Sequence, residues 1–409
     1  MNLTFKLAWR NLWRQPRRTW LTTGAMVFSN ILLVFLISLQ LGMYRMMIDN
    51  TLKAFTGHMQ VQAPEYQDDK KMRLTVPGIE SVAADIRAAT GLESVGARAA
   101  AFSLASSEER SYGVQIFGVE PDYEPLVSSI PGLTNKGRYL QDIAAPEVVI
   151  GSLLAKNLRV DIGDEVTLLG SGKDGSFAAA VVTVVGIFDS GLAELDRSVI
   201  EMPLAYFQEV YSMGDSGHLI SVNAPDLFLA DVVQQQVEQA LAGRDDVVVL
   251  DWDELQPGLQ QAIQADLAGA WFMYGILIIL VAFSVLNTQL MSVLERTREF
   301  GITMALGLTP GRLMRLIFLE TALMGGLGLL LGALLGGALV VYFGVNGFTW
   351  SGMEEMAGKF NVPGRIYPSV SLAGLFIGPT IVFVGSLLAA IYPAVRLHWL
   401  HPVSAMRSA

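Results

Sequence analysis

Four long stretches of this chain carry no charge, and a polar segment of more than two hundred residues separates the first stretch from the second. The stretches are Leu21–Tyr44, Leu267–Leu294, Thr321–Met353 and Ile366–Val395. Each exceeds the roughly 20 residues that a helix needs to cross the hydrocarbon core of a bilayer. The pattern predicts an α-helical membrane protein with four transmembrane helices and a large domain that folds on one side of the membrane.

The predicted boundaries follow from this pattern. A short amphipathic helix and a first span precede the large domain, and three further spans follow it. We expect the short helix over 1–19, spans over 20–47, 267–294, 313–343 and 368–395, the large domain over 48–266, connections over 295–312 and 344–367, and a tail over 396–409.

Charge is distributed unevenly along the chain, whose formal net charge is −10. Between Asp49 and Asp266 there are 14 Lys and Arg against 33 Asp and Glu, whereas the other residues carry 14 against 5. Because phosphate binding requires a basic surface, the acidic large domain argues against nucleic acid as a partner. With no cysteine and four scattered histidines, we expect neither disulfides nor a Cys/His metal site.

Basic residues in the short segments predict the orientation. They lie before the first span, between the second and third spans, and in the tail: Lys6, Arg10, Arg14, Arg17, Arg18, Arg296, Arg298, Arg312, Arg315, Arg396 and Arg407. Cytoplasmic segments of membrane proteins are enriched in Lys and Arg. We therefore expect both termini in the cytoplasm and the large domain outside.

The first twenty residues predict an amphipathic helix. At 100° per residue, an apolar arc lies beside a basic arc, formed by Phe5, Trp9, Leu12 and Trp13 and by Lys6, Arg10, Arg14 and Arg17. Such a helix lies in the headgroup layer, and Pro16 then allows a bend into the first span. Two interpretations stay open: a topological anchor, or an elbow helix that moves with a cytoplasmic partner.

The two ends of the large domain show similar strand and helix patterns. The strand patterns lie at Gly57–Ala63, Val95–Ala105, Tyr112–Val119, His218–Asn223 and Asp246–Asp251, and the helix patterns at Ile79–Thr90 and from Asp226, a candidate N-cap, to about Leu241. We expect one mixed α/β lobe assembled from about 48–124 and 206–266. The turn-rich residues between them, about 125–205, predict a β-rich insertion.

No catalytic motif emerges from the sequence. Gly170-Ser171-Gly172-Lys173 resembles part of a phosphate-binding loop, but Thr167 and Asp174 stand where the full pattern requires Gly and Ser or Thr. The acidic residues show no spacing that singles out a catalytic pair. We therefore expect a non-catalytic membrane subunit that holds no cofactor or metal of its own.

The connection between the second and third spans carries a family signature. It reads Glu295-Arg296-Thr297-Arg298-Glu299-Phe300-Gly301-Ile302 and then Met304-Ala305-Leu306-Gly307. This resembles the E-R-x-R-E-(I/F)-G-(I/L)-x-x-A-(L/I)-G signature of MacB/FtsX-type ABC permeases. The stretch Arg10–Arg14 resembles their N-terminal elbow, and His401–Arg407 resembles their common tail. In layout the chain looks most like the lipoprotein-releasing LolC/LolE group.

The resemblance implies roles for both sides of a bacterial inner membrane. The periplasmic domain corresponds to an α/β porter lobe with an inserted β-rich sabre lobe. The cytoplasmic segment corresponds to a coupling helix that sits on a separate ABC-type ATPase dimer, which holds ATP and Mg. Its residues are Glu295, Arg296, Arg298, Glu299, Phe300, Gly301, Ile302, Ala305, Leu306 and Gly307, with Trp9, Arg10, Trp13 and Arg14 in the elbow helix. The structural alternative is a segment that neutralises itself through i,i+4 pairs.

Two features of the third span have structural explanations. Glu320 is an acid at the edge of an apolar helix, where a carboxylate is costly unless it is paired. We expect an intramembrane pair rather than a functional acid, and the candidate partners are Arg296, Arg312 and Arg315. The glycines that repeat every four residues, Gly328, Gly332 and Gly336, permit close contact with a neighbouring span or with a second permease.

The resemblance makes mechanotransmission the leading hypothesis for the function. ATP hydrolysis would drive the periplasmic domain to release lipoproteins or other amphipathic cargo from the inner membrane. The expected partners are the ATPase, a second permease copy or paralogue, membrane lipids, and a periplasmic chaperone, adaptor or lipoprotein. The alternatives are MacB-like export of peptides, antibiotics or small molecules with a periplasmic adaptor, and FtsX-like regulation of a periplasmic enzyme.

Overall fold

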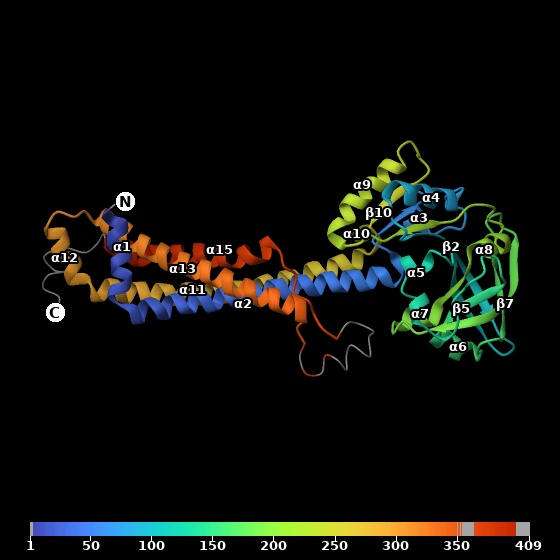
Figure 1. The fold of residues 1–409 in the computed structure, drawn as a ribbon, viewed down its shortest axis with the longest axis horizontal. Coiled ribbons are helices and arrows are strands. Elements are labelled where there is room, and N and C mark those ends of the chain that lie inside the picture. Colours follow the sequence, from blue (N-terminus) through green and yellow to red (C-terminus); the bar gives the residue numbers. More distant parts are fainter. Residues whose placement is uncertain (1–2, 350, 352, 354–363, 398–409) are drawn as a thin grey trace. The chain divides into compact units, whose positions relative to one another are not determined.

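The computed structural model describes residues 3–349, 351, 353 and 364–397, which form two compact units (Figure 1). Among these residues, the helical unit comprises 3–44, 262–349, 351 and 365–397, and the α/β unit comprises 45–261, 353 and 364. Half of the predicted outer loop 344–367 and the whole tail motif His401–Arg407 lie outside the described residues.

Four helices in the described part of the chain are long and apolar enough to cross a membrane. They are α2 (Pro16–Thr51), α11 (Pro257–Glu295), α13 (Pro310–Asn346) and α15 (Leu372–Ala389), which α16 (Ile391–Arg396) continues. The prediction of four transmembrane helices is thereby confirmed. The first three begin at a proline, whose fixed φ and missing N–H suit the first helical position. α11 therefore starts at Pro257, before the predicted 267.

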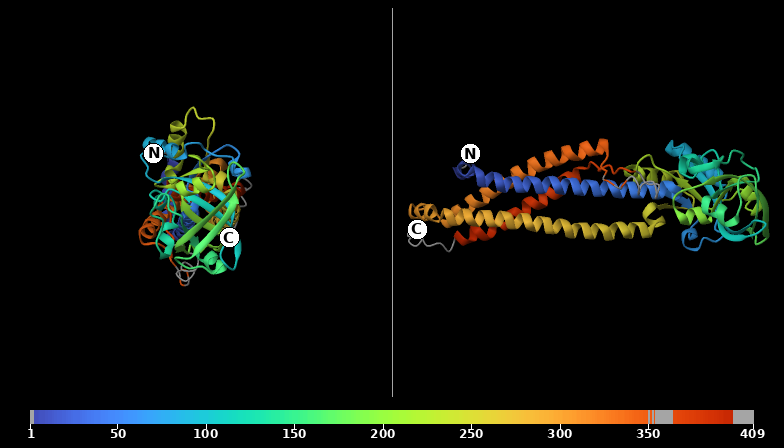
Figure 2. Two further views of the ribbon diagram at one scale, coloured as in Figure 1. Left: turned by 90° about the vertical axis from the view of Figure 1, so that its right-hand side faces the viewer. Right: turned by 90° about the horizontal axis from the view of Figure 1, so that it is seen from below.

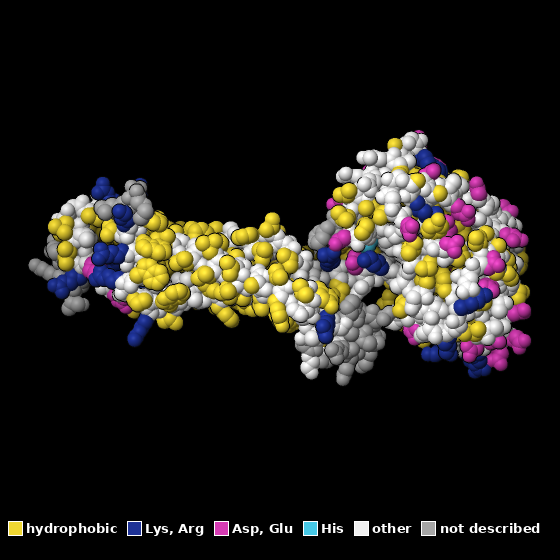
Figure 3. All heavy atoms as spheres, viewed as in Figure 1, with side chains coloured by type: hydrophobic (Ala, Val, Ile, Leu, Met, Phe, Trp, Pro, Cys, Tyr) yellow, Lys and Arg dark blue, Asp and Glu magenta, His cyan; other side chains and the backbone are white. Residues whose placement is uncertain are grey.

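The short helices α1 (Leu3–Arg14) and α12 (Thr297–Ala305) lie at the same end of the helical unit (Figures 1 and 2). Lys and Arg side chains gather at that end, whereas apolar side chains cover the long helices next to it (Figure 3). Apolar helices with Lys and Arg gathered beyond one end are typical of a protein that crosses a membrane. The surface of the α/β unit instead carries many Asp and Glu side chains.

The glycines of α13 pack against α2. A Cβ atom on Gly328 would lie 2.8 Å from the Cβ of Met26, and one on Gly332 would lie 2.3 Å from the Cβ of Asn30. Asn30 also donates a hydrogen bond to the carbonyl of Gly328 over 3.0 Å. Gly336 meets Val34 in the same way, one helical turn further along both helices. The glycine stripe is therefore covered by a span of the same chain.

Replacing Gly332 by alanine will push α13 away from α2. Overpacking of this kind costs roughly 1–3 kcal/mol, so thermal unfolding of Gly332→Ala in detergent should occur at a lower temperature than wild type. Gly326→Ala is the matched control, because a Cβ at that position meets nothing within 4 Å. Equal unfolding temperatures for Gly332→Ala and Gly326→Ala would contradict this packing.

A single ten-stranded sheet forms the centre of the α/β unit, in the order β10-β1-β9-β2-β3-β8-β5-β7-β4, with β6 paired to β2 and β7. The strands are β1 (Met59–Gln62), β2 (Val95–Ser106), β3 (Ser111–Val119), β4 (Thr134–Gly137), β5 (Glu147–Gly151), β6 (Glu165–Ser171), β7 (Phe177–Phe188), β8 (Val199–Pro203), β9 (Leu219–Val222) and β10 (Val248–Asp251).

Helices and short helical turns connect these strands. They are the π-helical turn η1 (Leu52–Thr56), α3 (Tyr66–Asp69), α4 (Ile79–Thr90), α5 (Glu124–Val127), η2 (Pro131–Leu133), α6 (Ser152–Leu158), α7 (Ala193–Ser198), α8 (Leu204–Val210), η3 (Leu227–Leu229), α9 (Ala230–Ala240) and α10 (Trp252–Leu255).

Strands from both ends of the large domain pair with one another, which confirms the prediction of one lobe assembled from both. β1 lies between β9 and β10, and β9 also pairs with β2. The insertion has no separate sheet, because β2 pairs with β9 of the lobe at one end and with β6 of the insertion at the other, and β3 pairs with β8. The Asp226 N-cap prediction is wrong: η3 intervenes before α9, and Asp226 instead forms an ion pair with Arg45.

The sheet is apolar on one face and polar on the other at β1. Met59 and Val61 join the core that includes residues of α4 and α9. Since side chains alternate along a strand, Gln60 and Gln62 lie on the opposite face.

Buried charges lie on the face opposite to α4 and α9. Arg98 and Glu124 form an ion pair in which neither side chain is exposed. Arg98 also donates a hydrogen bond to the carbonyl of Phe55 in η1. The Tyr139 hydroxyl donates to Glu201 over 2.6 Å. Burial and the negative charge of Glu124 raise the pKa of Glu201 to about 8.

Glu201 should make the stability of the protein depend on pH. Its carboxyl group binds a proton more tightly in the folded state than in the unfolded state, where its pKa is near 4.5. Between about pH 4.5 and 8, the folded protein thus holds more protons than the unfolded protein does. The free energy of unfolding therefore falls as pH rises through that window. Glu201→Gln resembles the protonated group and should remove this loss, on the order of 1–3 kcal/mol by pH 8.5.

Thermal unfolding of the full chain at pH 5.5 and 8.5 measures this effect. The wild type should lose more stability than Glu201→Gln on going to the higher pH. Glu209→Gln is the control, since Glu209 lies exposed on α8. Identical pH dependence in wild type and Glu201→Gln would show that Glu201 is ionised throughout the range.

Candidate functional site

The connection between α11 and α13 folds into the short helix α12, which ends in a glycine cap. The Gly307 N–H donates to the carbonyl of Met304 over 3.0 Å, and the Leu308 N–H donates to that of Thr303 over 3.1 Å. This pair of bonds is the Schellman motif, which needs a left-handed residue at its centre. Gly307 supplies it with φ of 96°, so the last glycine of the signature stops the helix.

One side of α12 is anchored in the helical unit. Phe300 is 3% exposed and Gly301 is also buried. Phe300 packs into a cluster drawn from the adjoining ends of the other helices: Val293, Leu313, Ile317, Ala394 and Leu397. Met304 packs against the same cluster. Phe300 and Met304 therefore fix the helix in place and are not available to a partner.

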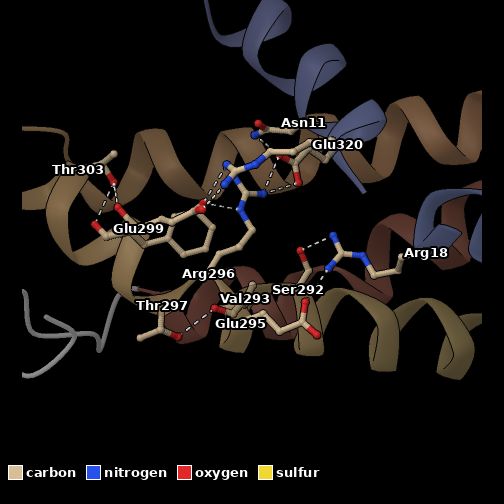
Figure 4. A network of polar contacts seen from close by, with 12 residues as sticks. Asn11, Arg18, Ser292, Val293, Glu295, Arg296, Thr297, Glu299, Thr303 and Glu320 are labelled. Carbon is tan, nitrogen blue, oxygen red and sulfur yellow. Dashed lines mark hydrogen bonds and ion pairs between the residues drawn. The ribbon is translucent and has the colours of Figure 1, made fainter. Parts of the chain in front are cut away.

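A buried polar contact holds α12 to two other helices (Figure 4). Glu320 of α13 is 5% exposed and accepts hydrogen bonds from Asn11 of α1 over 2.7 Å and from Arg296 over 3.3 Å. The guanidinium of Arg296 also lies over the Phe300 ring, 5.0 Å from its centre. This contact, which we call the Glu320 cluster (Asn11, Arg296, Glu320), joins α1, the start of α12 and α13.

Arg296 is thus the arginine that pairs with Glu320. Arg315 and Arg312, the other candidates, are exposed and form no ion pair within the described residues. The proposed pairing of Glu320 with Arg315 is therefore wrong. Five residues along a helix correspond to a rotation of about 140°, so Arg315 projects from a different side of α13 than Glu320 does.

More exposed ion pairs surround the Glu320 cluster. Glu299 accepts from Arg14 of α1 over 2.5 Å and from Arg296 over 3.2 Å. Arg18 of α2 lies 3.4 Å from Glu295. Partial burial would raise the pKa of Glu299, but hydrogen bonds from Arg14 and Arg296 outweigh it and hold the pKa below its usual range. The acids of the signature therefore pair mainly with α1 and α2, and not only within their own segment.

The elbow helix α1 presents two kinds of side chain. Ala8 and Leu12 are buried, whereas Trp9 and Trp13 are exposed and pack edge to face with ring centres 6.0 Å apart. Arg10 is exposed as well. Exposed Trp beside Arg is typical of a helix in the membrane interface.

The outward side of α12 and the turn after it form an apolar tip. We define the tip as the exposed residues Arg298, Ile302, Ala305, Leu306 and Leu308. Leu306 is 79% exposed and Ile302 is 46% exposed. Arg298 forms no ion pair with any described residue, so the tip offers apolar contacts and one free positive charge.

The sequence did not reveal three residues of this site. Asn11 lies within the elbow motif, but no pattern assigns it a partner on α13. Arg18 was interpreted only as a topological charge, yet it donates to Ser292 over 2.8 Å. Ser292 is a small polar residue in an apolar span and gives no signal of its own. Their contacts depend on how the helices pack, which local sequence does not specify.

Removing Arg296 should cost far more stability than removing the exposed Arg14. Arg296→Met leaves the Glu320 carboxylate buried without its positive partner, which typically costs about 3–5 kcal/mol. Arg14→Ala breaks a pair whose side chains are 65% and 43% exposed, and such pairs contribute about 0–1 kcal/mol. Thermal unfolding in detergent measures both. The double variant Arg296→Met/Glu320→Leu should recover most of the loss, and a double variant as unstable as the single one would refute the pairing.

Known families match both parts of the chain. The model of the MacB-like periplasmic core domain matches residues 19–240, and that of the FtsX-like permease C-terminal region matches 271–398. The lipoprotein-releasing system transmembrane protein LolC of Xylella fastidiosa is 25% identical over 317 residues, which cover 73% of this chain and 74% of that protein. LolE of Haemophilus influenzae is 26% identical over 308 residues, with 72% of each chain covered.

A further relative has a longer chain. The macrolide export ATP-binding/permease protein MacB of Acinetobacter baylyi is 22% identical over 416 residues, which cover 98% of this chain and 59% of that protein. The first family model covers more than half of the chain, and the second covers most of α11 and all of α12 and α13. Together with the four spans and the α/β unit, these matches confirm the resemblance seen in the signature. The chain belongs to the MacB/FtsX family of ABC transporter permeases, as a multi-pass membrane protein with a periplasmic α/β domain.

Proposed function

We propose that this chain couples ATP hydrolysis by a separate ABC-type ATPase, loaded with ATP and Mg, to movement of its periplasmic domain. In this proposal both termini and α12 lie in the cytoplasm, and α12 is the element that contacts the ATPase. The observation that carries it is the division of α12 into an exposed apolar tip and an anchored side. An apolar helix face of this kind suits a groove on a partner protein.

The Glu320 cluster supports transmission of a force that acts on the tip. α12 cannot tilt freely, because Phe300 is packed between helix ends and Arg296 is bound to Glu320. A displacement of α12 would therefore carry α1 and α13 with it. It would also act on α2 through Arg18 and Glu295. This favours the moving elbow helix over a passive anchor, with α1 and α12 moving as one body.

For the cargo, we propose lipoproteins or other amphipathic molecules released from the inner membrane. The support is the similarity to LolC and LolE. The matched residues cover 73% of this chain and 74% of LolC, and 72% of this chain and of LolE. A second permease copy or paralogue would complete the assembly, and a periplasmic chaperone or adaptor would receive the cargo. Export of small molecules, as the name of MacB describes, is the second candidate, supported by a match along 98% of this chain.

The tip can be tested by placing a charge on it. Leu306→Asp should reduce the amount of ATPase that co-purifies with the full chain from native membranes by about tenfold or more, because a buried carboxylate would disrupt an apolar interface. Val232→Asp is the matched control, since Val232 is an exposed valine on α9 of the α/β unit. Unchanged recovery of the ATPase with Leu306→Asp would refute α12 as the docking element.

The cargo requires a separate measurement. The complex of permease and ATPase is reconstituted in vesicles that contain a lipidated protein, and ATP-dependent appearance of that protein in the soluble fraction is followed. We expect discharge with ATP and none with a non-hydrolysable analogue. ATP-dependent movement of a macrolide without any discharge of lipidated protein would support the MacB-like alternative and contradict release of lipoproteins.

A further inference from the structure

The α/β unit contains a pocket of about 300 Å³ on the polar face of its sheet. β1, β2, β3 and β9 provide its floor, and η1, α3 and α10 contribute to its walls. It lies where the chain enters the unit at Thr51 and beside Gln256, just before α11. The pocket therefore adjoins the connection that leads from α2 into the unit and the one that leads from the unit into α11.

Five glutamine side chains line this pocket: Gln60, Gln62, Gln67, Gln115 and Gln256. The apolar part of the lining includes Phe55, Phe117 and Leu219. Lys70 is the one charged residue in the lining that is described. The pocket thus offers many neutral hydrogen-bonding groups, an apolar floor and almost no charge.

Gln62 is the buried side chain of this pocket whose amide group has no partner. Gln62 is 1% exposed, and neither its Oε1 nor its Nε2 atom has a hydrogen-bond partner among the described residues. A buried polar group without a partner costs about 1–3 kcal/mol. Its strand β1 is held between β9 and β10, so Gln62 lies inside the sheet and not at its edge.

The neighbouring amides are held in fixed orientations. Gln60 donates to the carbonyl of Thr56 over 2.7 Å, and Gln67 donates to that of Leu255 over 3.3 Å. Gln256 donates to the Thr56 hydroxyl over 3.3 Å. Each bond uses the amide nitrogen and leaves the amide oxygen as an acceptor. A ligand that satisfies these groups would therefore supply hydrogen-bond donors to the amide oxygens, and both a donor and an acceptor to Gln62.

The spacing of the amides selects the class of ligand. Gln60 and Gln62 are two residues apart on β1, so their side chains repeat at roughly 6.6 Å. An extended peptide presents its N–H and C=O groups on one side with the same repeat. An acyl chain would leave the Gln62 amide unpaired, and a phosphate would require more than one cation.

We propose that the glutamine pocket binds an extended, uncharged peptide segment. The inference rests on the proposed function only for the statement that this segment belongs to the cargo. In a lipidated protein, such a segment would be the polypeptide next to the anchor. The α/β unit would then bind the main-chain groups of the cargo. Because all peptides share these groups, one pocket could bind cargoes of different sequence.

Binding can be measured with the full chain in detergent and a defined probe. The probe is a fluorescein-labelled, N-acetylated and C-amidated hexapeptide of Ala, Ser and Asn, followed by fluorescence anisotropy. The same hexapeptide with N-methylated backbone amides lacks the N–H donors. We expect saturable binding of the first peptide and affinity lower by about tenfold or more for the second.

Two variants and a control locate the site. Gln62→Leu should weaken binding of the first peptide by about tenfold or more, without lowering the unfolding temperature, because it removes an unpaired buried amide. Gln115→Leu, at a half-buried position of β3, should weaken binding too and serves if Gln62→Leu fails to fold. Gln236→Leu on α9 should bind as wild type does, since Gln236 is exposed and lies outside the pocket.

Three results would overturn the proposal: no saturable binding at millimolar peptide, equal binding of the N-methylated peptide, or wild-type affinity in both pocket variants. The first would mean that the amides bind water only. Binding requires no ATPase, so failure of the chain to recruit an ATPase would refute the proposed function and leave the peptide site intact. Failure of the peptide to bind would leave the coupling through α12 intact.

Discussion

The Glu320 carboxylate, buried at one end of an apolar helix, is the constraint on which the helical unit depends. A carboxylate in that position must be paired, and its partners Arg296 and Asn11 come from the start of α12 and from α1. The pairing brings three segments that are distant in sequence to one place. Phe300 then packs beneath Arg296, and the residues left outside form the apolar tip. The surface proposed to meet the ATPase is thus a consequence of how the acid is neutralised.

Hydrogen bonds from an arginine hold the chain in place at each end of α2. Near its start, Arg18 binds Ser292 and Glu295 within the helical unit. Past its end, the carbonyl of Phe55 in η1 accepts a hydrogen bond from the buried Arg98 of the α/β unit. Arg98 in turn is neutralised by Glu124. A helix that carries force needs a firm contact at both ends, and these two contacts are consistent with that role for α2.

The sequence predicted the features that depend on composition and left open those that depend on packing. The four spans follow from apolar length, and the glycine repeat of α13 indicated a close helix contact, although only the structure shows Asn30 and Val34 of α2 opposite it. Glu320 was expected to be paired, yet three arginines qualified, and only the packing of α12 beside α13 shows that Arg296 is the partner. Gln62 gave no signal, since a glutamine in a short strand is unremarkable until its buried amide is found without a partner.

The central claim is that α1 and α12 move as one body when the ATPase acts. The chain has no cysteine, so spin labels can be placed without a background at Lys6→Cys on α1 and at Thr297→Cys, a position of α12 outside the tip. Pulsed electron paramagnetic resonance then measures the distance between them in the complex with the ATPase, without nucleotide and with trapped ATP. The account predicts the same distance in both states, and a broader distribution when Arg296→Met is added. A shift of about 5 Å or more, the size of one helical turn, would contradict it.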